Sequence, residues 1–282
     1  MAYKSLRDFI DQLEGEGGLK RVSRPVSTHL EMTEIQTRLL HRKGPAVLFE
    51  NPVHEDGRAS EMPALVNLFG TVERVARAVT LGGEPRKTAA ELREVGELLA
   101  FLRQPEPPRG FKDAMDMLPV ARSVLSMRPQ SVRKAPCQEV VLQGDDIDLN
   151  RLPIQGCWPG EPAPLITWPL VVTKGPSDAK EDDFNLGIYR MQKLSKDRTL
   201  MRWLKHRGGA QHYQRWKTER PEPLPAAAVL GADPGTILAA VTPVPDTLSE
   251  YQFAGLMRGR KAELVPCKTV PLKVPAEAEI VI

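Results

Sequence analysis

The apolar residues of the first hundred positions follow two patterns. Helical spacing, with apolar residues recurring every three to four positions behind a Ser or Thr, predicts four helices. Compact apolar runs bounded by Pro, Gly and Asn predict two buried strands. The helices are expected to begin at Ser5, at a capping box of Thr33 and Gln36, at Thr71 and at Thr88, and the strands to cover 46–49 and 64–69. Helices that alternate with strands favour an α/β fold for this part of the chain.

The pattern changes after the Pro-rich run QPEPPRG at 104–110. A short helical piece near 111–118 leads to the basic segment RPQSVRKAP at 128–136, and we place a domain boundary there, between 1–127 and 128–282. Beyond it, short apolar runs separated by Gly, Pro, Asp and Asn predict strands and turns. The strands are expected within 137–146, 147–155, 163–175, 226–230, 236–241 and 262–282, and one short helix over 249–258. Such a run favours a mostly antiparallel barrel or sandwich.

The stretch 185–209 stands out in this second part. It predicts two antiparallel strands joined by a polar turn at 195–197. Arginines at 190, 198, 202 and 207 lie among apolar residues, and two glycines follow. Guanidinium groups bind phosphate in bidentate fashion and glycine lets backbone amides approach, so the stretch could form one wall of a site for a phosphate-bearing aromatic cofactor. A solvated basic hairpin explains the same residues equally well.

Composition narrows the class of protein. The chain has 282 residues, of which 41% are hydrophobic and 27% charged, which is ordinary for a globular protein large enough for two domains. The formal net charge of +3 is too small for a general nucleic-acid surface. We expect no secretory leader and no membrane span, and the three widely spaced cysteines predict reduced thiols and a cytoplasmic location.

Familiar nucleotide and hydrolase signatures are missing from the sequence. It contains no GxGxxG after a strand, no P-loop, no GxSxG elbow and no HExxH, so a phosphate site would be built without them. Asn185 and Glu250 offer an amide oxygen and a carboxylate, which are donors that a hard divalent cation prefers. The sequence alone does not bring these two residues together, and a purely structural role is the commoner one for isolated residues of these types.

Longer phrases carry a more specific signal. They are LREVGELLAFLRQPEPPRGF at 92–111, GDDIDLNRLPIQGCWPGEPAPLITW at 144–168, NLGIYR at 185–190, MRWLKHRGGA at 201–210 and GADPGTILAAVTPVPDTLSEYQFAG at 231–255. In these phrases the chain resembles the amino-terminal part of the UbiD family of prenylated-flavin-dependent aromatic acid decarboxylases. The resemblance implies an α+β fold, with an amino-terminal α/β domain followed by a split β-barrel domain that binds the flavin.

Carried over by position, the resemblance implies a site in the second domain. Asn185 and Glu250 would be the protein ligands of a divalent metal, Mn²⁺, that bridges to the flavin phosphate. Arg190 would be catalytic, as part of the charged network around the reacting carbons. The prenylated FMN would contact Ile188, Tyr189, Arg190, Arg202, Trp203, Leu204, Arg207 and Gly208.

The activity implied by the resemblance is non-oxidative decarboxylation of 4-hydroxy-3-polyprenylbenzoate in ubiquinone biosynthesis. Loss of CO₂ from an aromatic carboxylate leaves an unstabilised carbanion, and the modified flavin provides the electron sink that side chains lack. The family also implies a flavin prenyltransferase as cofactor supplier, a homo-oligomer in the full-length form, and peripheral contact with the inner face of the cell membrane, where a polyprenylated substrate resides. We expect this chain to be a truncated form, because the family continues with an acidic proton donor and a carboxy-terminal domain.

Three classes of function fit these residues. The first is a decarboxylase polypeptide, acting on polyprenylbenzoate or on another aromatic acid. The second is a catalytically inactive flavin- or phosphate-binding module, which binding without turnover would identify. The third is a basic protein whose arginines contact nucleic acid, and the near-neutral total charge argues against it.

Overall fold

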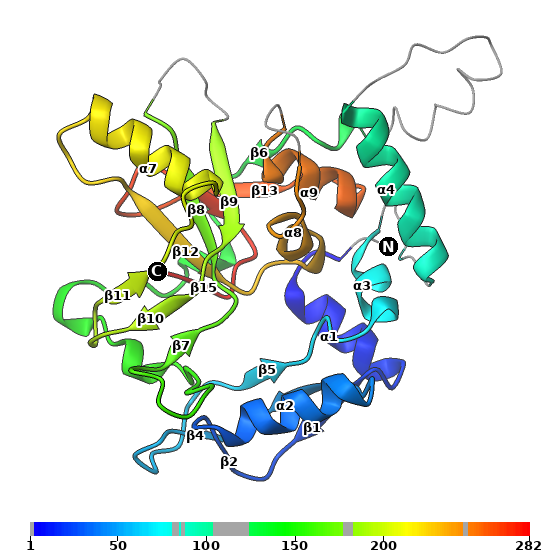
Figure 1. Cartoon of the computed structure of the whole chain (residues 1–282), viewed down its shortest axis with the longest axis vertical. Helices are drawn as coiled ribbons and strands as arrows, with labels where there is room; N and C mark the ends of the chain where they lie inside the picture. The colour runs from blue at the N-terminus through cyan, green and yellow to red at the C-terminus, as the bar shows by residue number, and fades with distance from the viewer. Residues whose placement is uncertain (1–2, 81–84, 86–87, 104–123, 177–182, 245–247) are drawn as a thin grey trace.

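The computed structural model describes residues 3–80, 85, 88–103, 124–176, 183–244 and 248–282, which form a mixed α+β structure (Figure 1). The first hundred residues build a small sheet with helices α1 to α4, and the rest build further sheets with helices α7 to α9. The short helix predicted near 111–118 lies outside the described residues. None of the described helices has the length and apolar character needed to cross a bilayer.

The first part of the chain builds a three-stranded sheet in the order β1–β3–β5. β1 (Leu19–Val22) runs parallel to β3 (Ala46–Phe49), and β3 pairs antiparallel with β5 (Ala64–Val66). Two short strands, β2 (Val26–Ser27) and β4 (Pro52–Val53), pair in parallel. All four residues of β3 are buried, which explains why its sequence is a continuous apolar run.

Side-chain caps explain where most helices of this part begin. α1 (Leu6–Gly15) starts at a capping box, in which the Ser5 hydroxyl accepts from the Asp8 amide and the Asp8 carboxylate accepts from the Ser5 amide. α3 (Val72–Ala78) starts at Thr71, whose side chain caps the Arg74 amide. α4 (Ala89–Arg103) follows Thr88, whose hydroxyl accepts from the Glu91 amide at 3.4 Å. These three helix starts confirm the prediction from sequence.

The capping box predicted at Thr33 and Gln36 is wrong. α2 (Glu31–His41) begins before Thr33, after a Leu30 with φ of 63° and no side-chain cap. Glu31, at the first helical position, accepts a hydrogen bond from the Ser27 amide at 2.8 Å and so joins the helix to the preceding strand. Thr33 lies inside the helix, and its hydroxyl contacts the amide oxygen of Gln155 from the second part of the chain at 3.4 Å.

Several sheets make up the second part of the chain (Figure 1). One has four antiparallel strands in the order β15–β12–β8–β9, another has the order β11–β10–β7, and a third has the order β14–β13–β6. Among the described residues these sheets do not close into a barrel. The strands are β6 (Gln130–Ser131), β7 (Leu165–Ile166), β8 (Leu170–Lys174), β9 (Phe184–Ile188), β10 (Met191–Lys193), β11 (Thr199–Met201), β12 (Ala226–Leu230), β13 (Glu263–Pro266), β14 (Lys273–Pro275) and β15 (Ile280–Val281).

The two strands predicted within 137–146 and 147–155 are wrong. Short 3₁₀ turns take their place, at Pro136–Gln138, Gly144–Asp146 and Leu149–Arg151. The apolar side chains at 140–142 are exposed, so the run that suggested a strand packs against no sheet.

The strand predicted at 236–241 is also wrong, whereas the helix predicted at 249–258 is confirmed. Residues 236–239 belong to α8 (Pro234–Ala239), in which Pro234 occupies the first turn and Asp233 caps the Thr236 amide. All six residues of α8 are buried, so its sequence shows no polar face that would reveal a helix. α9 (Glu250–Arg258) begins at a capping box formed by Ser249 and Gln252.

The predicted hairpin over 185–209 is three strands that belong to two sheets. β9 pairs with β8, and only β10 and β11 form a hairpin, around the turn at 195–197. In that turn the Ser195 hydroxyl donates to the Asp197 carboxylate at 2.7 Å. Gly208 and Gly209, which were expected to end a strand, begin helix α7 (Gly208–Glu219).

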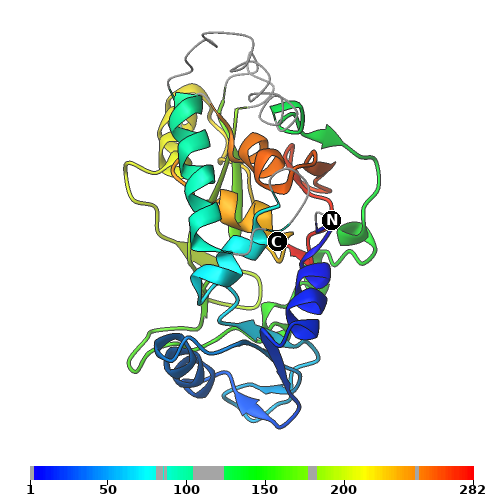
Figure 2. The ribbon, with the colours of Figure 1, turned by 90° about the vertical axis from the view of Figure 1, so that its right-hand side faces the viewer.

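Helix α9 belongs to both main hydrophobic cores. Phe9 and Leu13 of α1 pack in one cluster with Phe253 and Leu256 of α9, which joins the two ends of the sequence. Tyr251 of the same helix packs in a second cluster with side chains of β8, β9 and β13. In Figures 1 and 2, α8 and α9 lie between α4 and the carboxy-terminal strands. The sheets of the second part are therefore held against the helices of the first part through α9.

We expect Phe9→Ala to lower the free energy of unfolding by about 3–5 kcal/mol, because it leaves a cavity in the core that α1 shares with α9. Denaturation in urea measures the change. Leu40→Ala is the control, since Leu40 is 45% exposed on α2, and its cost should stay below about 1 kcal/mol. Equal costs for the two variants would contradict this packing of α1.

Candidate functional site

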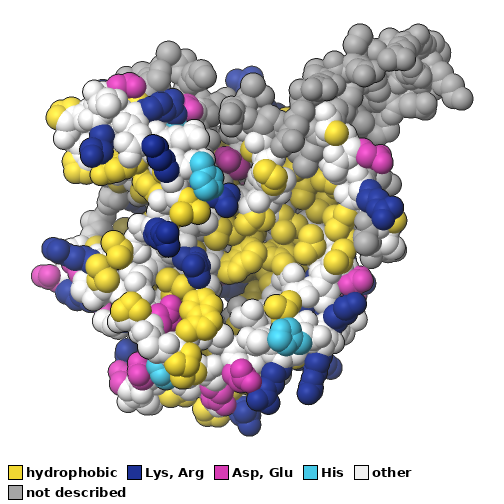
Figure 3. All heavy atoms as spheres, viewed as in Figure 1, with side chains coloured by type: hydrophobic (Ala, Val, Ile, Leu, Met, Phe, Trp, Pro, Cys, Tyr) yellow, Lys and Arg dark blue, Asp and Glu magenta, His cyan; other side chains and the backbone are white. Residues whose placement is uncertain are grey.

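A cavity of about 840 Å³ lies beside the end of β9, the β7–β10–β11 sheet and the residues that follow α8. Its lining combines apolar side chains with three arginines. On the same face, Figure 3 shows a hollow of apolar side chains with Lys and Arg side chains along its left rim. This size and this mixture of groups are typical of sites for small organic ligands.

The structure brings most of the predicted cofactor residues to this cavity. Six of the eight line it, namely Ile188, Tyr189, Arg190, Arg202, Leu204 and Arg207. Gly208 follows directly as the first residue of α7. Trp203 packs edge-on against Tyr189 and Tyr213, with ring centroids 5.9 and 6.1 Å apart, so its ring supports Tyr189.

The arginines of the cavity are not balanced by acids. Within the described residues, no carboxylate lies within 4.0 Å of the guanidinium nitrogens of Arg190, Arg202 or Arg207. Glu161 also lines the cavity, but one of its carboxylate oxygens accepts a hydrogen bond from the Cys157 amide at 2.8 Å. The cavity is therefore suited to an anionic ligand.

Arg190 lies over an aromatic ring at the edge of the cavity. The central carbon of its guanidinium is 5.9 Å from the centroid of the Trp158 ring, a distance at which a cation and an aromatic face attract each other. Trp158 is 51% exposed, so this pair forms an open wall. Because Arg190 makes no ion pair among the described residues, its donors remain available for a carboxylate or a phosphate.

The amino terminus of α7 meets β9 at very close range. A Cβ atom on Gly208 would overlap the amide oxygen of Asn185, so only glycine fits there without a shift. Asn185 is buried, and its amide nitrogen donates to the Tyr189 hydroxyl at 3.4 Å. That hydroxyl accepts from the Gly209 amide at 3.2 Å. The Asn185 amide is thereby held beside the positive end of the α7 dipole, where anions are favoured.

Glu250 approaches the same strand from α9. Its carboxylate accepts a hydrogen bond at 3.0 Å from the amide of Leu186, the residue next to Asn185. Burial raises the pKa of the Glu250 carboxyl, although hydrogen bonds from the Leu186 and Glu250 amides act in the opposite direction. A carboxylate with little access to water is stabilised by a cation, and the side-chain oxygens of Asn185 and Glu250 are donors that suit a hard divalent metal. The donor types therefore fit the implied metal.

The part of the chain that the structure describes contains no cluster of three or more His, Cys, Asp or Glu side chains that could hold a metal. The remaining ligands of a cation bound to Asn185 and Glu250 would have to be water or oxygens of a bound phosphate.

A buried polar cluster behind Asn185 was missed from the sequence. Thr173 faces Asn185 across the β8–β9 ladder, and its hydroxyl is hydrogen-bonded to Nδ1 of His212 at 2.9 Å. Nε2 of His212 lies 3.6 Å from the Asp183 carboxylate. Burial lowers the pKa of His212 more than the charge of Asp183 raises it, so the ring is neutral near pH 7. The cluster was missed because His212 lies on α7, which the paired glycines concealed.

Two protein-family models match this chain. The 3-octaprenyl-4-hydroxybenzoate carboxy-lyase Rift-related domain matches residues 129–282, and the N-terminal domain of the same carboxy-lyase matches residues 10–99. The first match alone covers more than half of the chain. The chain belongs to the UbiD family. The family resemblance found in the sequence is thus confirmed.

Solved structures of the UbiD class share this fold. The closed form of vanillic acid decarboxylase from Sedimentibacter hydroxybenzoicus is 26% identical, with a TM-score of 0.80 over 100% of this chain and 54% of that one. An evolved dimeric form of HmfF from Pelotomaculum thermopropionicum, in complex with prFMN, is 26% identical, with a TM-score of 0.75 over 99% and 56%. Apo 3,4-dihydroxybenzoic acid decarboxylase (AroY) from Klebsiella pneumoniae, at 24% identity and a TM-score of 0.76 over 99% and 54%, shows the fold alone. The chain spans about half the length of these UbiD-class chains.

We expect Gly208→Ala to lower the free energy of unfolding by about 1–3 kcal/mol, because the added methyl group forces Asn185 or the start of α7 to move. Thermal and urea denaturation measure the loss. Gly15→Ala, at the end of α1, is the matched control, since a Cβ atom there meets nothing within 4 Å. If both glycine variants are as stable as the parent, Gly208 and Asn185 are not in close contact.

Proposed function

We propose that this chain is the amino-terminal and flavin-binding portion of a UbiD carboxy-lyase that removes CO₂ from an aromatic acid without oxidation. The cavity carries the proposal, because arginines without acidic partners lie in it beside apolar side chains and next to the start of a helix. A flavin needs an apolar wall for its ring system and cations or free amides for its phosphate. The proposed substrate is 4-hydroxy-3-polyprenylbenzoate, and another aromatic acid is the alternative.

We assign the ends of the cofactor to different parts of the cavity. Arg202, Arg207 and the first turn of α7 would bind the phosphate of prenylated FMN. Asn185 and Glu250 would hold Mn²⁺, which offsets the phosphate charge and the charge of the Glu250 carboxylate. The ring system would lie against the remaining predicted contacts, which are Ile188, Tyr189, Arg190, Trp203, Leu204 and Gly208.

The side chains of this part would contribute placement and charge. When bound, prenylated FMN supplies the electron sink that loss of CO₂ from an aromatic ring requires. Arg190 would hold the substrate carboxylate by charge-assisted hydrogen bonds, while Trp158 limits where the guanidinium can move. Apolar side chains such as Leu200 and Val241 would exclude water from the cavity, which strengthens the interactions of its charges.

We also propose a domain division, an assembly and a location for the complete enzyme. We divide the chain at 127/128, and the separate matches of two family models to residues 10–99 and 129–282 support this division. The sheets of the second part would form a split β-barrel, and the enzyme would be a homo-oligomer supplied by a flavin prenyltransferase. A polyprenylated substrate requires peripheral contact with the inner face of the membrane from a cytoplasmic enzyme.

CO₂ release by the complete enzyme that contains this chain tests the activity. After anaerobic loading with prenylated FMN, it should release CO₂ from 4-hydroxy-3-polyprenylbenzoate, and vanillic and 3,4-dihydroxybenzoic acids serve as alternative substrates. Arg190→Met should lower kcat/KM by about 100-fold or more, because a charge that positions the substrate is lost. Arg198→Met, near the hairpin turn outside the cavity lining, is the matched control and should change it less than about threefold. Flavin binding without CO₂ release from any of these acids would favour the inactive module.

Flavin retention tests the metal assignment. After purification with Mn²⁺, Asn185→Ala and Glu250→Ala should each retain less flavin, because the phosphate would lose the cation that offsets its charge. Removal of the metal with EDTA should release flavin from the parent protein in the same way. Asn51→Ala and Glu219→Ala, at exposed positions, are the controls. Equal flavin content in the parent and all four variants would refute the assignment.

A further inference from the structure

A second cavity, of about 360 Å³, lies on the opposite side of β10 from the first. Successive residues of a strand point to opposite faces, and accordingly Gln192 lines the first cavity whereas Lys193 lines the second. Its other walls come from residues 28–58 of the first part of the chain and from residues 150–164 of the second. None of the chemistry proposed above uses this cavity.

Two cationic side chains converge on one residue at this cavity. Nζ of Lys193 donates to the side-chain oxygen of Asn150 at 2.5 Å, and a guanidinium nitrogen of Arg58 donates to the backbone oxygen of Asn150 at 3.1 Å. No carboxylate of the described residues lies within 4.0 Å of Lys193. The nearest acid to Arg58 is Asp56, at 3.7 Å. Arg58 is thus paired loosely with Asp56, whereas Lys193 has no carboxylate within this distance in the described part of the chain.

The two carboxylates that line the cavity each have a partner among its other lining residues. Asp56 accepts a hydrogen bond from the Arg58 amide at 3.0 Å inside its own turn, and this bond lowers the pKa of Asp56. The side chain of Glu55 is 70% exposed and lies 3.7 Å from Nδ1 of His29. Neither carboxylate neutralises Lys193.

His54 adds a buried nitrogen that lacks a partner. Its Nε2 is shielded from solvent and has no hydrogen-bond partner in the described part of the chain. Burial, the charge of Arg58 and the charge of Lys193 all lower the pKa of His54, and Asp56 raises it by less. Because this nitrogen is shielded from solvent, an anion in the cavity would act on the imidazole through its charge, in the direction opposite to Arg58 and Lys193.

We propose that this cavity binds a phosphate-class oxyanion, held by Arg58 and Lys193 beside the His54 ring. Guanidinium, ammonium and imidazolium groups are the side chains that form charge-assisted hydrogen bonds with phosphate. Leu152, Ile154 and Pro164 also line the cavity and leave room for a small organic body. The oxyanion is therefore either inorganic phosphate or the phosphate of a small organic monoester. This site does not depend on the function proposed for the first cavity.

Titration with inorganic phosphate, followed through the NMR signals of the His54 ring, tests this proposal. Bound phosphate should raise the pKa of His54, because an anion favours the imidazolium and offsets the charges of Arg58 and Lys193. The other titratable groups that line the cavity are His29, Glu55 and Asp56, and Asp148 lies near enough for the charges of Arg58 and Lys193 to lower its pKa. Chloride at equal ionic strength controls for screening of all these charges. The variants at Lys193 and Arg58 described below distinguish this site from phosphate bound at the arginines of the first cavity.

A second titration, with phenyl phosphate, distinguishes the two sources of the oxyanion. Tighter binding of phenyl phosphate than of inorganic phosphate identifies an organic monoester, because the phenyl ring would bury apolar surface against Leu152 and Ile154. Equal affinities, or weaker binding of phenyl phosphate, identify inorganic phosphate. Either result supports an oxyanion site at this position.

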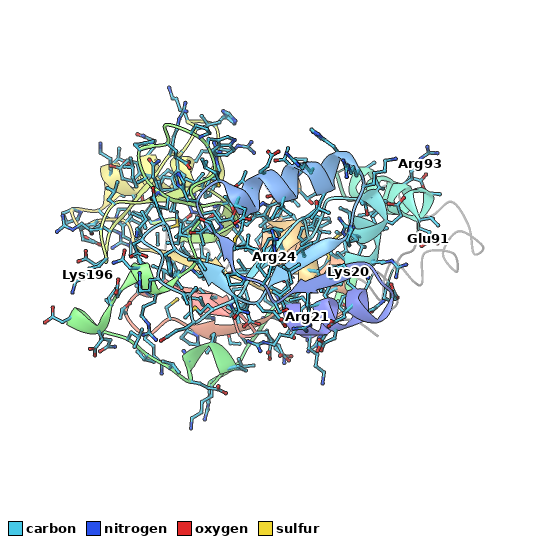
Figure 4. All side chains as sticks on the ribbon, turned by 90° about the horizontal axis from the view of Figure 1, so that it is seen from below. Lys20, Arg21, Arg24, Glu91, Arg93 and Lys196 are labelled. Carbon is cyan, nitrogen blue, oxygen red and sulfur yellow. The ribbon has the colours of Figure 1, made fainter. Side chains whose placement is uncertain are left out.

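Lys193→Met and Arg58→Met should each weaken phosphate binding by about tenfold or more, because each removes one charge-assisted contact. Lys196→Met is the matched control, since it removes the same charge from the exposed turn of the same hairpin, at one end of the molecule (Figure 4). Its phosphate affinity should be unchanged. If Lys193→Met does not fold, Arg58→Met decides. Absence of a saturable shift at His54, or an equal loss of affinity in Lys196→Met, overturns the proposal.

Discussion

The hydrogen bond from the Leu186 amide to the Glu250 carboxylate is the contact on which the arrangement of the site depends. It ties β9 to the first turn of α9, and α9 contributes Phe253 to one core and Tyr251 to the other. A carboxylate buried without such a bond would be strongly unfavourable. Because Arg190 lies two residues after the end of β9, this strand links its position at the cavity to both cores.

The sequence predicted the start of a helix correctly where the capping side chain and the amide it binds lie within the first turn of that helix. Ser5, Thr71 and Ser249 each cap the amide three positions along, so the sequence contains the whole interaction. The sequence failed where burial removes the helical pattern or where an unusual local contact determines the start of a helix. α8 is buried on all sides and therefore lacks a polar face, and α2 begins where the Glu31 carboxylate meets the Ser27 amide. The apolar run at 140–142 misled the strand prediction, because its side chains are exposed and it belongs to none of the described strands.

The sequence predicted which residues belong to the candidate site, but it did not predict how they are arranged in space. Long sequence phrases pointed to the arginines of the cavity, and the structure gathers them there. The close approach of Gly208 to Asn185 depends on how α7 packs against β9, and no spacing in the sequence expresses it. His212 was overlooked because the sequence of α7 does not show a helical pattern. This helix buries glycine, alanine and histidine instead of a stripe of hydrophobic residues.

β10 separates two cavities whose unpaired side chains are mainly cationic. Gln192 on one face and Lys193 on the other are joined by a single peptide bond, so the electrostatic potentials of the two cavities overlap. An anion in the second cavity would make the potential at the first less positive and would weaken binding of a phosphate there. Solvent screening keeps this effect small, because Arg190, Arg202 and Arg207 are exposed.

Binding free energies at the two cavities are linked reciprocally, so a flavin phosphate in the first cavity would weaken anion binding in the second equally. Mutual strengthening of the two sites would therefore require β10 itself to shift.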